Sequence, residues 1–196
     1  MTGTDQPSWL VPKAVERLAG HETFTGSNLT VLDFWRWGFS DLRTNIVRGV
    51  LAEFLVAQAV GDPSPLRQAW DNHDVTTPSG VRVEVKSSAY LQSWNQRRIS
   101  SIVFTGLTGR VWSPETNEFS AERELRADVY VFAIHTCQTP DEYDPLDLDY
   151  WDFRVLPAVA LREHGNRSIT KRLLDQLAPT SHQLDGLADA IEQAAA

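Results

Sequence analysis

The chain has 196 residues, of which 42% are hydrophobic, 22% charged and 10% aromatic, a composition typical of a globular protein. Its single cysteine, Cys137, excludes a disulfide framework and a zinc site built from several cysteines, and it fits a reducing compartment. No apolar run approaches the roughly 18 residues needed to cross a bilayer, and the N-terminal residues lack the pattern of a secretory signal. We therefore expect a cytoplasmic protein with no membrane partner.

The formal net charge of −8 disfavours a protein that coats nucleic acid by bulk electrostatic attraction, although it is compatible with a local basic cleft. Much of the negative charge lies in residues 141–152, which carry six carboxylates and no basic residue. This run lacks the ligand spacing, the glycine and the closing glutamate of an EF-hand. We interpret it as a solvated surface loop.

The expected elements mix helices and strands. Residues 1–39 form a lead-in, with a short helix near 12–18 and then an aromatic-rich segment, and residues 40–196 form the main domain. A long helix from about Ser40 to Val60 opens the domain and ends at a Gly-Asp-Pro stop signal. The later elements are a hairpin over 70–88, strands at 99–104, 128–136 (buried and central) and 150–155, a helix from Pro157, and an amphipathic helix over 184–196. This order indicates a mixed α/β domain.

Glu53 is the one ionisable residue between Gly49 and Gly61 of the long helix. Helical periodicity places it in the middle of an apolar stripe that includes Ile46 and Val60, on a helix that we expect to be largely buried. A lone buried carboxylate is costly unless it meets a cation, a metal or strong donors. A functional role explains it, and so does a salt bridge to an arginine elsewhere, such as Arg43 or Arg98.

The strand 81–88 reads VRVEVKSS, and its alternation places the valines on one face and Glu84 and Lys86 on the other. Many solvent-facing strands share this pattern. When the hairpin reverses at 77–80, however, Asp74 stands beside Glu84. Crowded carboxylates are hard to ionise unless a divalent cation neutralises them, and oxygen ligands select Mg²⁺ or Mn²⁺.

The order and spacing of Glu53, Asp74 and the tripeptide Glu84-Val85-Lys86 resemble the PD-(D/E)xK nuclease superfamily. The resemblance covers roughly residues 42–104, and His73 stands where the family name has proline. It implies a restriction-endonuclease-like fold, a mixed β-sheet flanked by α-helices, and an activity that hydrolyses DNA with Mg²⁺ or Mn²⁺. It implies no organic cofactor.

By that resemblance, Asp74 and Glu84 hold the metal, with the carbonyl of Val85 as a third ligand. Glu53 binds a second metal or a metal-bound water, and Lys86 orients or helps to deprotonate the attacking water. Gln92 resembles an auxiliary polar residue of some members, and the alternative is an ordinary surface amide.

Local basic residues are candidates for contacts with DNA phosphates, although each is also explained as a solvated charge. They are Arg43, Arg48, Arg97 and Arg98, with a further basic stretch at 162–172. The tryptophans, Trp70 among them, could stack on bases or fill a core. Cutting both strands of a duplex is easiest with two sites, which favours a homodimer.

The sequence thus predicts a metal-dependent endonuclease that acts on DNA. Two alternatives stay open: a nuclease for RNA or for branched or damaged DNA, and a nuclease-fold protein that binds without catalysis. Other catalytic schemes find little support, because the five histidines lack paired metal spacing and neither a Walker A motif nor GxGxxG is present.

Overall fold

The computed structural model describes residues 14–62, 64, 66, 67, 71–113, 116, 118–165 and 168–196. The chain divides into two compact units, Met1–Ser40 and Asp41–Ala196. No helix within the described residues is long and apolar enough to span a membrane.

The first unit contains helix α1 (Val31–Phe39), which the sequence patterns above did not predict as a helix. It begins at a capping box, in which the Thr30 hydroxyl accepts from the Asp33 amide and the Asp33 carboxylate accepts from the Thr30 amide. The helix expected near 12–18 is absent from residues 14–18, which are exposed and irregular, while residues 12 and 13 lie outside the described part. Without a packing partner, so short a segment does not offset the cost of helix nucleation.

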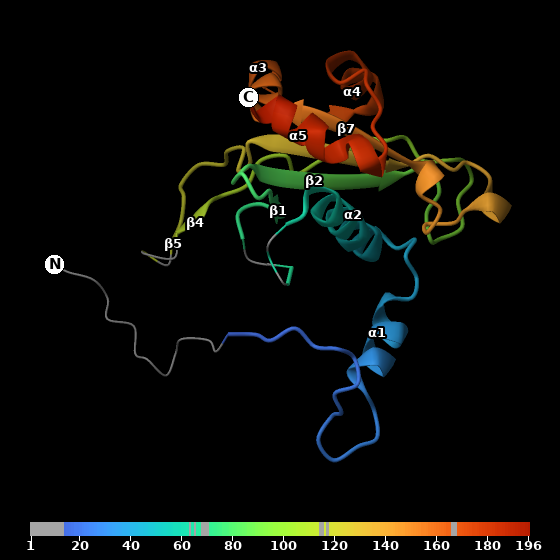
Figure 1. Ribbon diagram of the computed structural model, residues 1–196. Coiled ribbons are helices and arrows are strands. Elements are labelled where there is room, and N and C mark those ends of the chain that lie inside the picture. Colours follow the sequence, from blue (N-terminus) through green and yellow to red (C-terminus); the bar gives the residue numbers. More distant parts are fainter. Residues whose placement is uncertain are drawn as a thin grey trace. The chain divides into compact units, whose positions relative to one another are not determined.

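A four-stranded sheet in the order β1-β2-β6-β7 forms the centre of the second unit (Figure 1). Strand β2 (Arg82–Ala89) pairs antiparallel with β1 (Val75–Thr76) and parallel with β6 (Val129–His135). Strand β7 (Trp151–Pro157) pairs antiparallel with β6. Every residue of β6 is buried, which confirms the prediction of a buried central strand.

Helices cover both faces of this sheet, so the second unit is a mixed α/β structure. Helices α2 (Asn45–Val60) and α5 (Leu187–Ala195) pack against the buried valines of β2 and β6 on one face. Helices α3 (Ala158–His164) and α4 (Lys171–Leu177) pack around the aromatic residues of β6 on the other face. Figure 1 shows α2 on one side of the sheet and α3 and α4 on the other.

Smaller elements connect the strands and helices. Strand β3 (Val103–Phe104), where a longer strand was predicted, pairs with β8 (Ile169–Thr170) in a sheet of its own. Strand β4 (Trp112–Ser113) pairs with β5 (Glu118–Phe119). Single 3₁₀ turns are η2 (Pro140–Glu142), η3 (Leu148–Tyr150) and η4 (Leu184–Gly186), the last leading into α5.

The acidic run 141–152 is a surface loop over most of its length, since its carboxylates up to Asp149 are exposed. Asp152 is the exception, because it lies in β7 and is only 9% exposed. Its carboxylate forms an ion pair with Arg154 at 2.7 Å and accepts a hydrogen bond from Ser181. The interpretation as a solvated loop is therefore wrong for Asp152.

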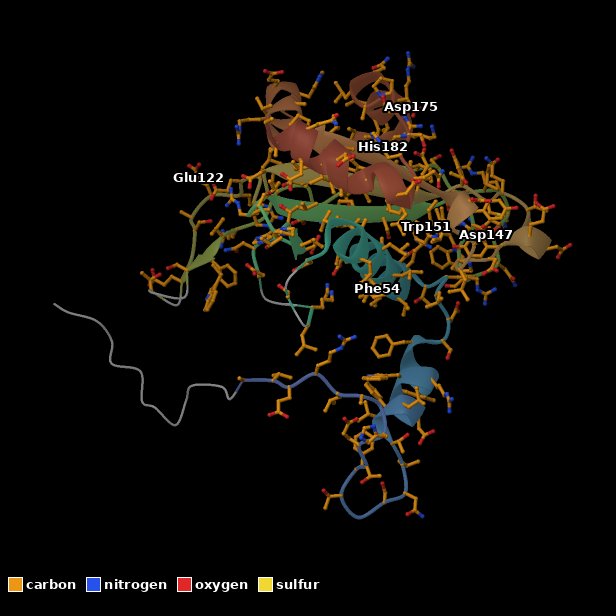
Figure 2. The ribbon with its side chains drawn as sticks, viewed as in Figure 1. Phe54, Glu122, Asp147, Trp151, Asp175 and His182 are labelled. Carbon is orange, nitrogen blue, oxygen red and sulfur yellow. The ribbon has the colours of Figure 1, made fainter. Side chains whose placement is uncertain are left out.

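Helix α2 begins at Asn45 rather than near Ser40, because Thr44 caps its N-terminus by accepting a hydrogen bond from the Val47 amide. Its end at Gly61 agrees with the predicted stop signal. The buried face differs from the predicted stripe: Ile46 is 80% exposed, and the buried residues are Arg48, Ala52, Leu55, Val56 and Val60. Figure 2 shows Phe54, which is 56% exposed, on the side of α2 away from the sheet.

Candidate active site

The hairpin brings Asp74 to the strand that carries Glu84 and Lys86. Val75 pairs with Val83, and the Asp74 amide donates a hydrogen bond to the Val83 carbonyl at 3.0 Å, so Asp74 extends the pairing by one position toward Glu84. The Asp74 carboxylate accepts a hydrogen bond from the Val85 amide at 2.8 Å. Because β1 begins only at Val75, this carboxylate takes the place of a further main-chain partner along β2.

Glu84 is buried, with 1% of its surface exposed, although many strands with its sequence pattern turn such a residue to solvent. Its Oε1 accepts hydrogen bonds from Lys86 Nζ at 2.5 Å and from Arg126 Nη2 at 3.1 Å. Its Oε2 is buried and has no hydrogen-bond partner within the described structure. The two cations therefore compensate the buried charge from one side and leave the second oxygen free for a ligand.

Burial, followed by the negative charges of Glu84 and then Glu53, raises the pKa of Asp74 to about 6. The hydrogen bond from the Val85 amide and the charge of Lys86 oppose this rise in pKa. Three carboxylates are thus close enough for their charges to interact. A divalent cation would relieve this repulsion and favour the ionised form of Asp74.

Glu53 is bound by an arginine, as one of the two readings of the sequence expects, but the partner is Arg67 rather than Arg43 or Arg98. Arg67 Nη2 donates to Glu53 Oε1 at 3.0 Å, and Arg67 Nε donates to Glu53 Oε2. The negative charge of Glu53 raises the pKa of Asp74, and the negative charge of Asp74 raises the pKa of Arg67. The Glu53–Arg67 pair therefore lies close to Asp74. Glu53 is therefore near the site, with its charge already compensated.

The donor set fits one hard cation better than two. Within the described ranges, no group of three or more His, Cys, Asp or Glu side chains is arranged to hold a metal ion. Asp74 and Glu84 supply two carboxylates: Asp74 has a raised pKa, and Glu84 has a buried oxygen with no hydrogen-bond partner in the parts of the chain that the structure describes. The Val85 carbonyl points to the same edge of β2 as its amide, toward Asp74. Two carboxylates and this carbonyl fit Mg²⁺ or Mn²⁺, which take oxygen ligands and keep several waters.

Gln92 holds the segment that follows β2. Its Nε2 donates to the Ala89 carbonyl at 2.9 Å and to Ser100 Oγ at 3.3 Å, and its main-chain amide donates to Gln96. Its Oε1 is buried and has no partner within the described structure. The reading as an ordinary surface amide is therefore wrong, and the auxiliary role in catalysis stays a prediction.

Arg126, like Arg67, is a residue of the site that the sequence did not predict. It precedes β6 and reaches Glu84 across a separation of 42 residues, so no local pattern marks it. Its backbone is fixed by Tyr130, whose hydroxyl accepts from the Arg126 amide at 3.3 Å and donates to the Leu107 carbonyl at 2.8 Å. The site thus holds two cations beside Glu84, one on the E-x-K strand and one on the loop before β6.

The candidate phosphate-binding arginines differ in their surroundings. Arg48 is only 3% exposed, and its guanidinium donates to the Arg43 carbonyl and to Asn45, so it is not available to a phosphate at the surface. Arg43 is exposed and bonded to Asp41, and Arg97 and Arg98 are exposed. Trp70 lies outside the described residues, and so does Arg167 in the basic stretch 162–172.

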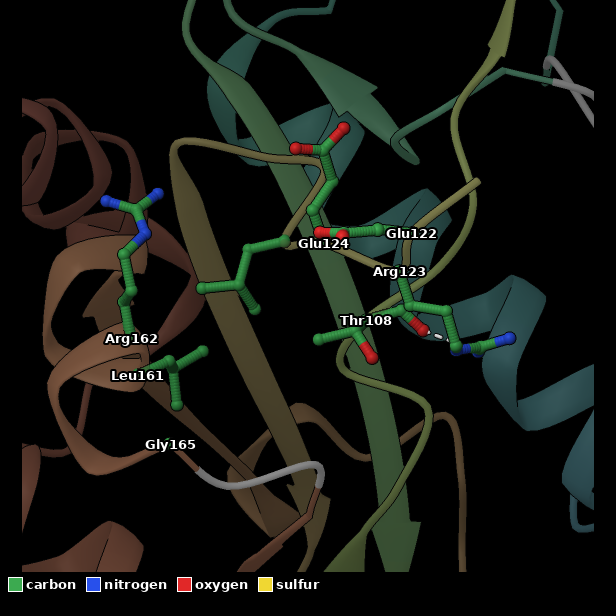
Figure 3. Close-up of a pocket in the computed structure, with 8 residues that line it drawn as sticks. Thr108, Glu122, Arg123, Glu124, Leu161, Arg162 and Gly165 are labelled. Atoms are coloured by element: carbon green, nitrogen blue, oxygen red, sulfur yellow. Dashed lines mark hydrogen bonds between the residues drawn. The ribbon is translucent and has the colours of Figure 1, made fainter. Parts of the chain in front are cut away.

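A separate cavity of about 540 Å³ lies between the segment 122–125 and helix α3 (Figure 3). Its lining combines two glutamates with Arg123 and Arg162, and Arg123 donates a hydrogen bond to the Thr108 carbonyl at 2.6 Å. None of the candidate catalytic residues belongs to this lining. The cavity is therefore distinct from the carboxylate cluster.

No model of a known protein family matches the chain, and no curated protein matches it significantly. The fold defines a mixed α/β protein with a mixed sheet.

Proposed function

We propose that this protein is a cytoplasmic, metal-dependent endonuclease that hydrolyses phosphodiester bonds of DNA with Mg²⁺ or Mn²⁺. The observation that carries the proposal is the convergence of Asp74 and Lys86 on Glu84, whose second carboxylate oxygen is buried and has no hydrogen-bond partner among the described residues. The order Asp, Glu-x-Lys along one hairpin, with a glutamate on the helix before it, also matches the pattern of PD-(D/E)xK nucleases.

Each residue has a role that its position supports. When bound, the divalent cation would acidify a water and stabilise the charge that develops on the phosphate. Asp74 and Glu84 would bind it, together with the Val85 carbonyl. Lys86 would orient the water and offset negative charge with an ammonium that Glu84 already holds in place. Glu53, fixed by Arg67, would orient a water at the edge of the site.

A plasmid-nicking assay with and without Mg²⁺ tests this function. We expect the wild-type protein to cleave only with the metal, and Glu84→Gln and Lys86→Ala to lose at least about 100-fold in rate, the usual minimum contribution of such groups. Lys171→Ala is the matched control, because Lys171 forms its own ion pair with Asp175 on α4. Undiminished cleavage by Lys86→Ala would exclude the assignment.

The same assay separates the substrates. Parallel digestion of duplex DNA, single-stranded DNA, branched DNA and RNA shows which phosphodiester is preferred. Linear plasmid formed without a nicked intermediate would indicate paired active sites, as a homodimer provides.

A second candidate, a nuclease-fold protein that binds without catalysis, is favoured by one observation. Glu53 and Glu84 are already compensated by Arg67, Lys86 and Arg126, so the site is electrically balanced without a metal. Such a protein would show no rise in melting temperature with Mn²⁺. A true metal site stabilises by mass action, by about 2.7 kcal/mol at a ligand concentration of 100 times the dissociation constant.

A further inference from the structure

Arg126 and Lys86 bind the same oxygen of Glu84. Lys86 Nζ lies 2.5 Å from Oε1, and Arg126 Nη2 lies 3.1 Å from it. The Arg126 side chain is 25% exposed, so it contacts the buried carboxylate on one side and solvent on the other. Both cations contact Glu84, but only Arg126 presents a planar group with five donors.

The placement of Arg126 depends on Gly109. A Cβ at position 109 would lie 2.7 Å from Arg126 Nε and 2.8 Å from Cζ, closer than real Cβ contacts. The main chain here is fixed, because Gly109 and Glu124 exchange two backbone hydrogen bonds at 3.0 and 2.9 Å. A side chain at 109 would therefore displace the guanidinium and leave the two paired segments in place.

The formal charges around Glu84 balance when no metal is bound. Asp74, Glu84 and Glu53 supply three carboxylates, and Lys86, Arg126 and Arg67 supply three cations. A divalent cation at Asp74 and Glu84 would come close to the guanidinium, which repels it. Since a guanidinium binds phosphate oxygens as well as carboxylate oxygens, a phosphate offers Arg126 an alternative partner.

We propose that Arg126 exchanges Glu84 for a substrate phosphate when the divalent cation binds. This inference rests on the proposed nuclease function. In the substrate-free protein the Arg126–Glu84 ion pair opposes the binding of metal, and in the loaded site the released guanidinium contacts the phosphate. The protein would thereby bind its metal weakly alone and more strongly together with DNA.

Titration calorimetry with Mn²⁺ alone, on the full chain, tests the exchange. We expect Arg126→Gln and Gly109→Ala to bind Mn²⁺ about tenfold more tightly than the wild type, because a nearby like charge has been removed or displaced. At saturating Mn²⁺, both variants should cleave DNA at least about tenfold more slowly, since the phosphate loses its charged partner. Arg126→Lys should fall between Arg126→Gln and the wild type in both measurements.

Arg123→Gln is the matched control, because Arg123 lies three positions away and bonds to the Thr108 carbonyl instead of Glu84. It should change neither measurement. Unchanged Mn²⁺ affinity in Arg126→Gln and Gly109→Ala, with a wild type that binds Mn²⁺ and cleaves, would overturn the exchange and leave the nuclease function standing. A gain in affinity without a loss of cleavage would overturn it as well. A wild type that neither binds Mn²⁺ nor cleaves would overturn both proposals.

Discussion

Single residues of the candidate site are arranged at a cost to stability. Asp74 is placed where burial and the charges of Glu84 and Glu53 disfavour its ionised form. In the described part of the chain, Glu84 keeps a buried oxygen without a hydrogen-bond partner, which leaves part of its desolvation uncompensated. Groups held in such unfavourable states are typical of functional sites, because a bound ligand can supply the missing charge compensation or hydrogen bond.

The pH dependence of stability should reveal the cost at Asp74. Its pKa is raised from 3.8 to about 6 in the folded state, so the folded protein retains a proton that the unfolded chain has lost, and stability falls as the pH rises through this window. Asp74→Asn removes this loss and keeps an oxygen that accepts from the Val85 amide. We expect the variant to gain about 1–3 kcal/mol in unfolding free energy at pH 8, and little at pH 4.

Urea denaturation of the metal-free protein at pH 8 and pH 4 measures this gain. Asp71→Asn serves as the control, because Asp71 is exposed and lies in the same segment. If Asp74→Asn were equal to or less stable than the wild type at pH 8, the carboxylate would not be strained by its neighbours. With saturating Mn²⁺ the order should reverse, since the wild type alone keeps both carboxylates.

Among the secondary-structure elements, helix α2 has ends that are set by local sequence signals and an orientation that is set by packing. Its two ends are set locally, by the Thr44 cap and by Gly61 in the left-handed conformation with φ 68°. Its orientation is set by packing, because apolar residues occur on all sides of the helix and several faces could have been buried. This orientation places Glu53 beside Asp74 and Arg67 rather than in the core.

Gly49 inside α2 and Gly61 at its C-cap provide a matched pair of substitutions. Gly61→Ala should destabilise the protein by about 1 kcal/mol, because an L residue is strained at this positive φ. Gly49→Ala should stabilise it by about 0.5–1 kcal/mol, because position 49 lies inside the helix and a Cβ there meets nothing within 4 Å. Thermal and urea denaturation of both variants check the opposite signs. Equal effects would mean that the helix end does not depend on Gly61.

The hairpin and the central strand could be predicted because their signals are local. The alternation in VRVEVKSS and the turn before it fix the register that brings Asp74 to Glu84. The apolar run of β6 fixes its buried position. Arg126 and Arg67 could not be predicted as partners, since they meet their glutamates across 42 and 14 residues through tertiary packing. Helix α1 could have been predicted from a local signal, because Thr30 and Asp33 form the capping box at its start.

At the scale of the whole molecule, both buried clusters belong to the second unit. The cluster under α2 and α5 and the cluster under α3 and α4 contain residues from Leu51 onward only, and they enclose the sheet from its two faces. The candidate site combines Glu53 from helix α2, Asp74, Glu84 and Lys86 from the hairpin, and Arg126 from the loop before β6. Its geometry is therefore determined by residues 41–196.

Removal of residues 1–40 should accordingly leave the second unit folded and its activity intact. Helix α1 has no buried residue, and every described member of the two clusters belongs to the second unit. We expect the unfolding free energy to change by less than about 1 kcal/mol, a small part of the usual 5–15 kcal/mol, with unfolding still cooperative in urea. Removal of residues 187–196 is the contrasting deletion, because it takes Leu187 and Ile191 out of the cluster under α2, and it should abolish cooperative unfolding. If the first deletion also abolished cooperative unfolding, the two units would have to fold as one, and the site would depend on the N-terminal segment.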